Sequence, residues 1–161
     1  MRRVEGSSGV SLMECTSPVK DKWRIRWDVQ EKENGSASYM EEEFGHKPTD
    51  EEIHTLVMSW YNSQTDAAIL SGFAYNGAHV WLSVENQYNY KAAYDLAVQT
   101  GGETLPVTFK FGSDEQPEYH TFTQLEELKD FYTKAVGFIQ TVLAEGWEKK
   151  DKFNLELYRI E

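Results

Sequence analysis

Three times along this chain, a stretch of alternating apolar and polar residues broken by a turn is followed by a stretch with apolar residues at helical spacing. These units begin near Trp23, Phe73 and Val107. A period of two is typical of a half-buried strand, and spacings of three and four are typical of an amphipathic helix. One unit cannot bury its own apolar faces, so the units must pack on one another. The order predicts an α+β fold of successive β-hairpin–α-helix units, with an antiparallel sheet packed against about three helices.

The first unit contains the longest alternating stretch. Its apolar positions are Trp23, Ile25, Trp27 and Val29. The pair Asn34-Gly35 favours a tight turn, and a return strand is expected over residues 37–44. Thr49 and Glu52 form a capping box, which predicts a helix from about residue 50. We expect this helix to fray or bend near residues 62–63 and to end at Gly72.

The second and third units follow the same order. In the second, the pair Asn76-Gly77 joins strands 73–75 and 80–82, and Ser83 caps a helix that closes at residues 101–102. In the third, strands 107–111 and 119–122 precede a capping box at Thr123 that opens the longest helix. The tail, residues 154–161, alternates Leu155, Leu157 and Ile160, which predicts a short edge strand.

Before the first unit, residues 1–22 show no strand or helix periodicity and contain several glycines and serines. They are therefore expected to form an irregular arm. The remainder, residues 23–161, is expected to be a single α+β domain with sub-units 23–71, 72–102 and 103–161.

The last helix carries an apolar seam at alternating spacings of three and four residues. The seam consists of Leu125, Leu128, Tyr132, Ala135, Ile139 and Val142. Such a heptad seam either packs across the sheet of its own chain or pairs with a second copy. Flanking apolar residues make the face broader than a two-stranded seam needs, which favours packing within the chain. Self-association through the seam remains the alternative.

Aromatic residues make up 14% of the chain and are dense around the middle hairpin. Tyr75, Trp81 and Tyr88 are the candidates for an exposed patch on which a sugar ring could stack. Core packing accounts for most aromatic residues of a small domain. The patch is therefore a candidate glycan-binding or host-surface-binding site, to be weighed against a purely structural role.

The formal net charge of −11 and the pI of about 4.8 set limits on partners. An acidic surface repels both the phosphate backbone of nucleic acid and an anionic membrane. No apolar run approaches the roughly 20 residues that span a bilayer, and residues 1–9 do not resemble a signal peptide. We expect a cytoplasmic protein without a nucleic-acid or membrane partner. The single Cys15 allows no internal disulfide.

The sequence lacks the common motifs that carry chemistry. The four histidines lie in different predicted elements, and none has a partner at metal-ligand spacing. No phosphate loop or nucleophile elbow occurs. The acidic runs 41–43 and 50–52 fit a solvated strand and the first turn of a helix. The sequence therefore favours a non-catalytic protein without cofactor or metal.

Two stretches carry a resemblance to a known family. Residues 66–77, which end in Gly72-Phe73-Ala74-Tyr75-Asn76-Gly77, and residues 80–87 resemble a domain of unknown function found in bacteriophage and prophage tail-associated proteins. Residues 109–111 and the helix over 123–147 fit the same pattern, so the resemblance covers about residues 65–150. It implies a virion-associated or prophage accessory protein whose partners are other tail proteins or itself, and it transfers no catalytic residue.

Three hypotheses about function follow. The first is a non-catalytic structural or tail-assembly accessory protein that acts through protein–protein contacts. The second is a glycan-binding or host-surface-binding module. The third is an enzyme whose active site is assembled from distant segments.

Overall fold

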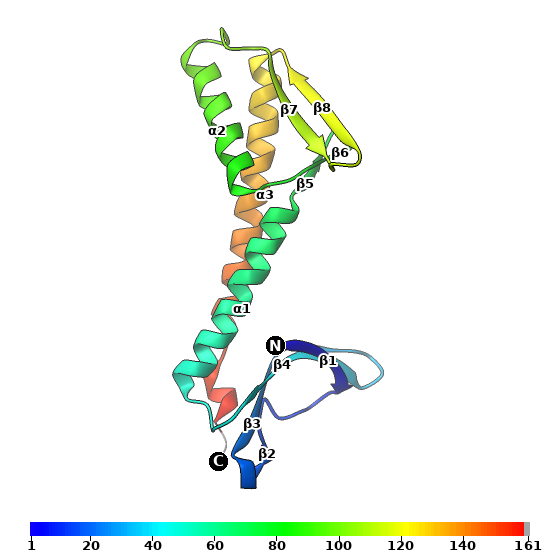
Figure 1. The fold of residues 1–161 in the computed structure, drawn as a ribbon, viewed down its shortest axis with the longest axis vertical. Helices are drawn as coiled ribbons and strands as arrows, with labels where there is room; N and C mark the ends of the chain where they lie inside the picture. Colours follow the sequence, from blue (N-terminus) through cyan, green and yellow to red (C-terminus); the bar gives the residue numbers. More distant parts are fainter. Residues whose placement is uncertain (160–161) are drawn as a thin grey trace. The chain divides into compact units, whose positions relative to one another are not determined.

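The computed structural model describes residues 1–159 and shows the predicted α+β fold (Figure 1). The chain divides into two compact units. Unit 1 comprises Met1–Trp60 together with the described residues from Lys152 onward, and unit 2 comprises Tyr61–Asp151. The boundary between them falls inside a helix and differs from the boundary at residues 71–72 suggested by the pattern of repeats.

Unit 1 contains a four-stranded antiparallel sheet of β1 (Arg2–Ser7), β2 (Met13–Ser17), β3 (Lys22–Glu31) and β4 (Ser36–Phe44), in the order β1-β4-β3-β2. A short 3₁₀ helix, η1 (Pro18–Lys20), connects β2 to β3. The prediction of an irregular arm over residues 1–22 is wrong, because β1 pairs with β4 and β2 pairs with β3. Both are edge strands, whose pairing rests on backbone hydrogen bonds and needs little apolar alternation.

One face of this sheet packs against the first half of α1 (Asp50–Ser71). Ile25 and Trp27 are buried there, and the Trp27 ring meets the Trp60 ring edge-on at 6.1 Å. The predicted edge strand over 154–161 is wrong. Residues Leu155–Tyr158 form a 3₁₀ helix, η2, whose Asn154 side chain accepts from the Glu156 amide at 3.0 Å. Ile160 lies outside the described residues.

The capping box of α1 is confirmed. The Glu52 amide donates to Thr49 Oγ1 at 3.2 Å, and the Thr49 amide donates to the Glu52 carboxylate at 2.8 Å. The helix does not fray at residues 62–63, because α1 is continuous from Asp50 to Ser71. Gly72 ends the helix with φ of +72°, and a β-carbon there would lie 1.7 Å from the Val80 carbonyl oxygen. Only glycine fits at this approach.

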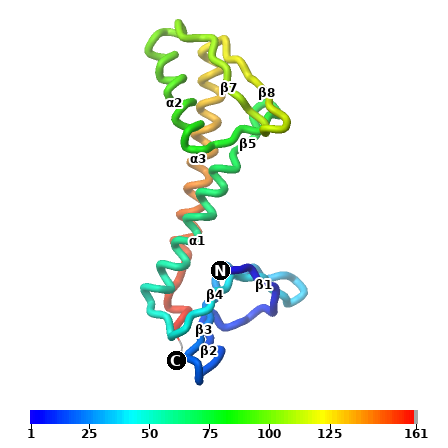
Figure 2. Tube along the Cα trace, in the orientation of Figure 1, coloured from blue at the N-terminus to red at the C-terminus, as the bar shows by residue number. Residues whose placement is uncertain are grey.

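Unit 2 contains two hairpins and two further helices. The hairpins are β5 (Phe73–Tyr75) with β6 (Ala78–Val80) and β7 (Val107–Gly112) with β8 (Pro117–Phe122), and each stays a separate two-stranded sheet. The helices are α2 (Val84–Gln99) and α3 (Leu125–Asp151). The trace in Figure 2 shows α2 and β8 both running beside the first half of α3.

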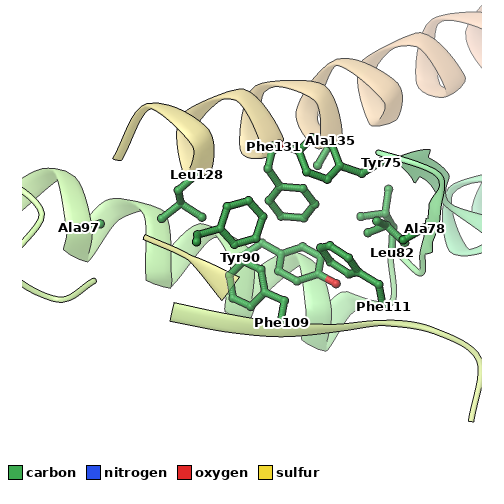
Figure 3. Packing of buried hydrophobic residues seen from close by; sticks show 12 residues of the cluster. Tyr75, Ala78, Leu82, Tyr90, Ala97, Phe109, Phe111, Leu128, Phe131 and Ala135 are labelled. Atoms are coloured by element: carbon green, nitrogen blue, oxygen red, sulfur yellow. The ribbon is translucent and has the colours of Figure 1, made fainter. Parts of the chain in front are cut away.

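The core of unit 2 is built around Phe131 of α3. Figure 3 shows aromatic side chains from several elements converging on it. The ring centroids of Tyr90, Tyr75, Phe122 and Phe111 lie 5.0, 5.1, 5.2 and 5.3 Å from that of Phe131. Edge-to-face and tilted pairs at these distances stabilise a core beyond simple area burial. This cluster holds α2 and α3 in register and so positions the surface described next.

Candidate binding surface

An open groove of about 340 Å³ lies between α2 and α3 in unit 2. Apolar and aromatic side chains dominate its lining. The lining residues are Leu82, Val84, Gln87, Tyr88, Tyr90, Lys91, Tyr132, Ala135, Val136 and Ile139. We call this surface the α2–α3 groove. Its volume lies within the range of about 300–1,000 Å³ that is typical of small-molecule pockets.

The floor of the α2–α3 groove is buried and its rim is exposed. Leu82, Tyr90 and Ala135 are at most 3% exposed and belong to the core cluster. Val84 and Tyr88 on the rim are 77% and 75% exposed. Large apolar side chains left in water beside a preformed apolar hollow are typical of a surface that binds another molecule.

Two ionisable side chains of the groove, Tyr90 and Lys91, have raised pKa values. Burial raises the pKa of Tyr90 to about 12, so its hydroxyl stays protonated. Lys91 forms an ion pair with Asp95, and the hydrogen bond to that carboxylate raises the pKa of Lys91. The groove is therefore suited to apolar contact and carries little charge of its own.

The structure separates the three residues of the predicted aromatic patch. Tyr75 is 3% exposed, and its hydroxyl donates to Asp130 Oδ2 at 3.3 Å, so it belongs to the core. Alternation on β5 turns Tyr75 toward Phe131. Tyr88 lies on the rim of the α2–α3 groove, whereas Trp81, 44% exposed, lines a different hollow. Tyr75 is therefore not part of an exposed aromatic patch. Trp81 and Tyr88 are exposed, but they line two different hollows.

The seam residues of α3 pack within their own chain, as favoured above. Leu128 and Ala135 are buried in the core, and Leu125, Tyr132 and Ile139 pack against it. Val142 is half-buried. Tyr132, Ala135 and Ile139 also line the groove, so part of the seam remains accessible. Self-association through this seam stays the alternative hypothesis.

The histidines and the cysteine are dispersed. His46 Nε2 lies 2.9 Å from a Glu52 oxygen, and His120 Nε2 lies 2.8 Å from a Glu127 oxygen. Cys15 is half-buried on β2. Within residues 1–159, no group of three or more histidine, cysteine, aspartate or glutamate side chains is placed to hold a metal ion. Among the helices of the same segment, none is long and apolar enough to cross a membrane.

Sequence reasoning missed Val84 and Val136 of the groove. The signal was present, because Val84 and Tyr88 are one helical turn apart on α2, and Tyr132, Val136 and Ile139 are spaced by four and three on α3. Each set continues a stripe that also contains core residues. The spacing of apolar residues along a helix does not show which edge of a broad apolar face is exposed to water.

Comparison with known proteins adds one finding about the family. No curated protein and no solved structure matches the chain significantly. The family model described as "Domain of unknown function (DUF4376)" matches residues 52–161, from the first turn of α1 onward. The match leaves the four-stranded sheet of unit 1 outside the family domain and includes the whole α2–α3 groove. The chain belongs to the DUF4376 family.

Proposed function

We propose that this chain is a non-catalytic accessory protein of phage or prophage origin that acts in tail assembly by binding another protein through the α2–α3 groove. The observation that carries the proposal is the pairing of an apolar floor with an exposed apolar rim at Val84 and Tyr88. The resemblance of residues 65–150 to tail-associated domains supports the phage context. On this proposal the protein is cytoplasmic when made and joins the virion during assembly.

The occupant that suits the groove is an apolar segment of a partner protein, flanked by lysine or arginine. Covering Val84 and Tyr88 removes apolar surface from water, which stabilises a complex by about 25 cal/mol per Å² buried. The chain carries 27 acidic against 16 basic side chains, so a basic partner approaches with favourable long-range attraction.

Charge disfavours a second copy of the chain as the occupant. Each copy carries a net charge of −11, and like charges brought together at an interface oppose association. We therefore expect a monomer in light scattering at physiological salt. A dimer that dissociates when Tyr88 is replaced by alanine would assign the groove to self-association instead.

The test uses two rim variants with matched controls. The protein is co-expressed with the tail proteins encoded beside its gene, and affinity for any partner that co-purifies is measured by calorimetry. Tyr88→Ala and Val84→Asp are expected to weaken binding at least tenfold. Tyr119→Ala and Val19→Asp make the same changes at exposed residues, 69% and 97% exposed, that do not line the groove, and these variants should bind like the parent chain. Failure of every neighbouring tail protein to bind, or rim variants that bind normally, would refute the proposal.

A further inference from the structure

A second hollow, of about 490 Å³, lies elsewhere on unit 2. Its lining comes from the connection between β6 and α2, the first turn of α2, the end of β7 and the turn between β7 and β8. The lining residues are Trp81, Asn86, Lys110, Gly112, Ser113 and Asp114. None of them lines the α2–α3 groove. In contrast to the groove, the hollow combines one aromatic side chain with several polar ones, and we call it the Trp81 hollow.

Trp81 is held in place while a large part of it remains exposed. Its indole Nε1–H donates to the Gly112 carbonyl at 3.0 Å, and its own carbonyl accepts from Asn86 Nδ2 at 3.0 Å. The His79 ring packs against the indole at 4.6 Å, nearly perpendicular to it. Because the indole nitrogen already has its partner, the 44% of the residue that is exposed offers mostly ring carbon. A fixed, flat apolar surface loses little entropy when it binds a ligand.

The polar groups around Trp81 supply both donors and acceptors. Lys110 Nζ lies 2.7 Å from Asp114 Oδ1, and this hydrogen bond lowers the pKa of Asp114, so the carboxylate is ionised at neutral pH. Asn86 contributes an amide oxygen. The Ser113 Oγ accepts from the Gln116 amide at 3.0 Å, which leaves its hydroxyl hydrogen able to donate. A carboxylate and an ammonium side by side can each bond one of two neighbouring hydroxyl groups.

We propose that the Trp81 hollow binds the ring of a neutral saccharide. One face of a sugar ring presents mainly C–H groups, which suit the indole surface, while its hydroxyls both donate and accept. Asp114 would accept from one hydroxyl, and Lys110 and Ser113 would donate to others. The paired charges of Lys110 and Asp114 offset each other, and the net charge of −11 further disfavours an anionic ligand. This inference is independent of protein binding in the α2–α3 groove.

The test is nuclear magnetic resonance on the full chain labelled with ¹⁵N. Glucose, galactose, N-acetylglucosamine and their disaccharides are titrated to high millimolar concentration, with glucuronic acid and inorganic phosphate as anionic comparisons. We expect a saturable shift of the Trp81 indole resonance, assigned by Trp81→Phe, with at least one neutral sugar. The indole of Trp147, 56% exposed and outside the hollow, serves as an internal control and should not move.

Two variants complete the test, with circular dichroism to establish that each is folded. Binding followed from the sugar signals should be lost in Trp81→Ala and weakened at least tenfold in Asp114→Asn, whereas Tyr88→Ala should leave it unchanged. The proposal is overturned if no neutral sugar gives a saturable shift, if only the anions do, or if both hollow variants bind normally. Loss of sugar binding with intact partner binding, or the reverse, separates this proposal from the proposed function.

Discussion

Gly146 of α3 faces Thr65 of α1 so closely that a β-carbon on residue 146 would lie 2.3 Å from Thr65 Oγ1 and 3.3 Å from Thr65 Cγ2. Gly146 is buried at this contact. The two helices approach here because one of them lacks a side chain, as is common where helices pack closely. Glycine in a helix interior normally weakens the helix, so its presence at this position reflects packing.

We predict that Gly146→Ala destabilises the protein by about 1–2 kcal/mol, even though alanine is the better helix former by about 1 kcal/mol. The steric cost of the added methyl group exceeds the gain in helix propensity. The free energy of unfolding, measured by chemical denaturation, checks the prediction. Adding Thr65→Ala removes both of the closest atoms and should restore most of the lost stability.

Gly137 in the same helix is the matched control for Gly146. A β-carbon on residue 137 meets no atom within 4 Å, and the residue is exposed. Gly137→Ala should therefore stabilise the protein by about 0.5–1 kcal/mol. Equal effects of the two substitutions would contradict the contact between Gly146 and Thr65.

A second prediction concerns Glu41, which is 3% exposed on β4. Its carboxylate lies 2.8 Å from Arg2, 3.4 Å from Arg24 and 3.8 Å from Arg26. The two longer contacts, both from Nε atoms, lack hydrogen-bond geometry and act through charge attraction. Glu41→Gln removes this attraction while the guanidinium groups stay in place, and should cost about 2–3 kcal/mol of unfolding free energy.

Glu43, two residues along β4, provides the comparison for Glu41. It pairs with Arg24 at 2.7 Å, but its side chain is 51% exposed. An ion pair in contact with water contributes little to stability, so Glu43→Gln should cost much less unfolding free energy than Glu41→Gln. If the denaturation curves of Glu41→Gln and Glu43→Gln superimpose, the burial of Glu41 does not affect the free energy of unfolding.

Much of the fold could be predicted because its central strands alternate regularly. Residues 23–27 of β3, strand β5 and the turn at Asn76-Gly77 lie as expected, but the return strand β6 covers residues 78–80 and not the predicted 80–82. Beyond Trp27 the alternation fails, because the register between β3 and β4 shifts between Trp27 and Gln30, and Asp28 takes a φ of +50°. A bulge of this kind serves the curvature of the sheet and leaves little trace in local polarity.

The candidate sites were less accessible to sequence reasoning because they depend on which faces meet. Tyr75 and Trp81 are both aromatic and lie six residues apart, yet one is in the core and the other is exposed. Lys110 and Asp114 join Trp81 only because the β7–β8 turn folds against the connection that precedes α2. The proximity of Lys110 and Asp114 to Trp81 depends on how the hairpins and helices pack around Phe131. The periodicity of the sequence does not specify this packing.

A third prediction concerns acid stability at the start of α1. The pKa of Glu52 is lowered mainly by the hydrogen bond from the Thr49 amide and, to a smaller extent, by the hydrogen bond with His46. A carboxyl with a lowered pKa in the folded state contributes stability above its unfolded pKa, and the contribution is lost as pH falls through the folded pKa. Glu52→Gln should therefore be less stable than the parent chain at neutral pH. Its free energy of unfolding should also fall less than that of the parent chain as pH drops below about 4.

The pKa of Glu52 can also be measured directly by following its carboxyl carbon in a magnetic resonance titration. In His46→Ala the pKa should rise but stay below the ordinary glutamate value, because the Thr49 amide, the larger cause, remains. An unshifted Glu52 in the parent chain would show that the capping box does not persist in solution.

The fourth prediction concerns alkaline pH and Tyr90, which is buried against Phe131 and Phe109. Burial disfavours the phenolate and raises the pKa of Tyr90 from 10.0 to about 12. As pH rises, the Tyr90 hydroxyl loses its proton in the unfolded chain before it does so in the folded chain. The free energy of unfolding is therefore unaffected by Tyr90 below about pH 10 and falls as pH rises from about 10 toward about 12. Tyr90→Phe should lose less stability than the parent chain across this window in denaturation experiments.

Tyr88→Phe is the control for Tyr90→Phe. It changes a tyrosine that is 75% exposed, and its stability should vary with pH as in the parent chain. Ultraviolet titration provides a direct check, because a parent chain in which every tyrosine ionises near pH 10 while still folded would contradict the burial of Tyr90 in this core.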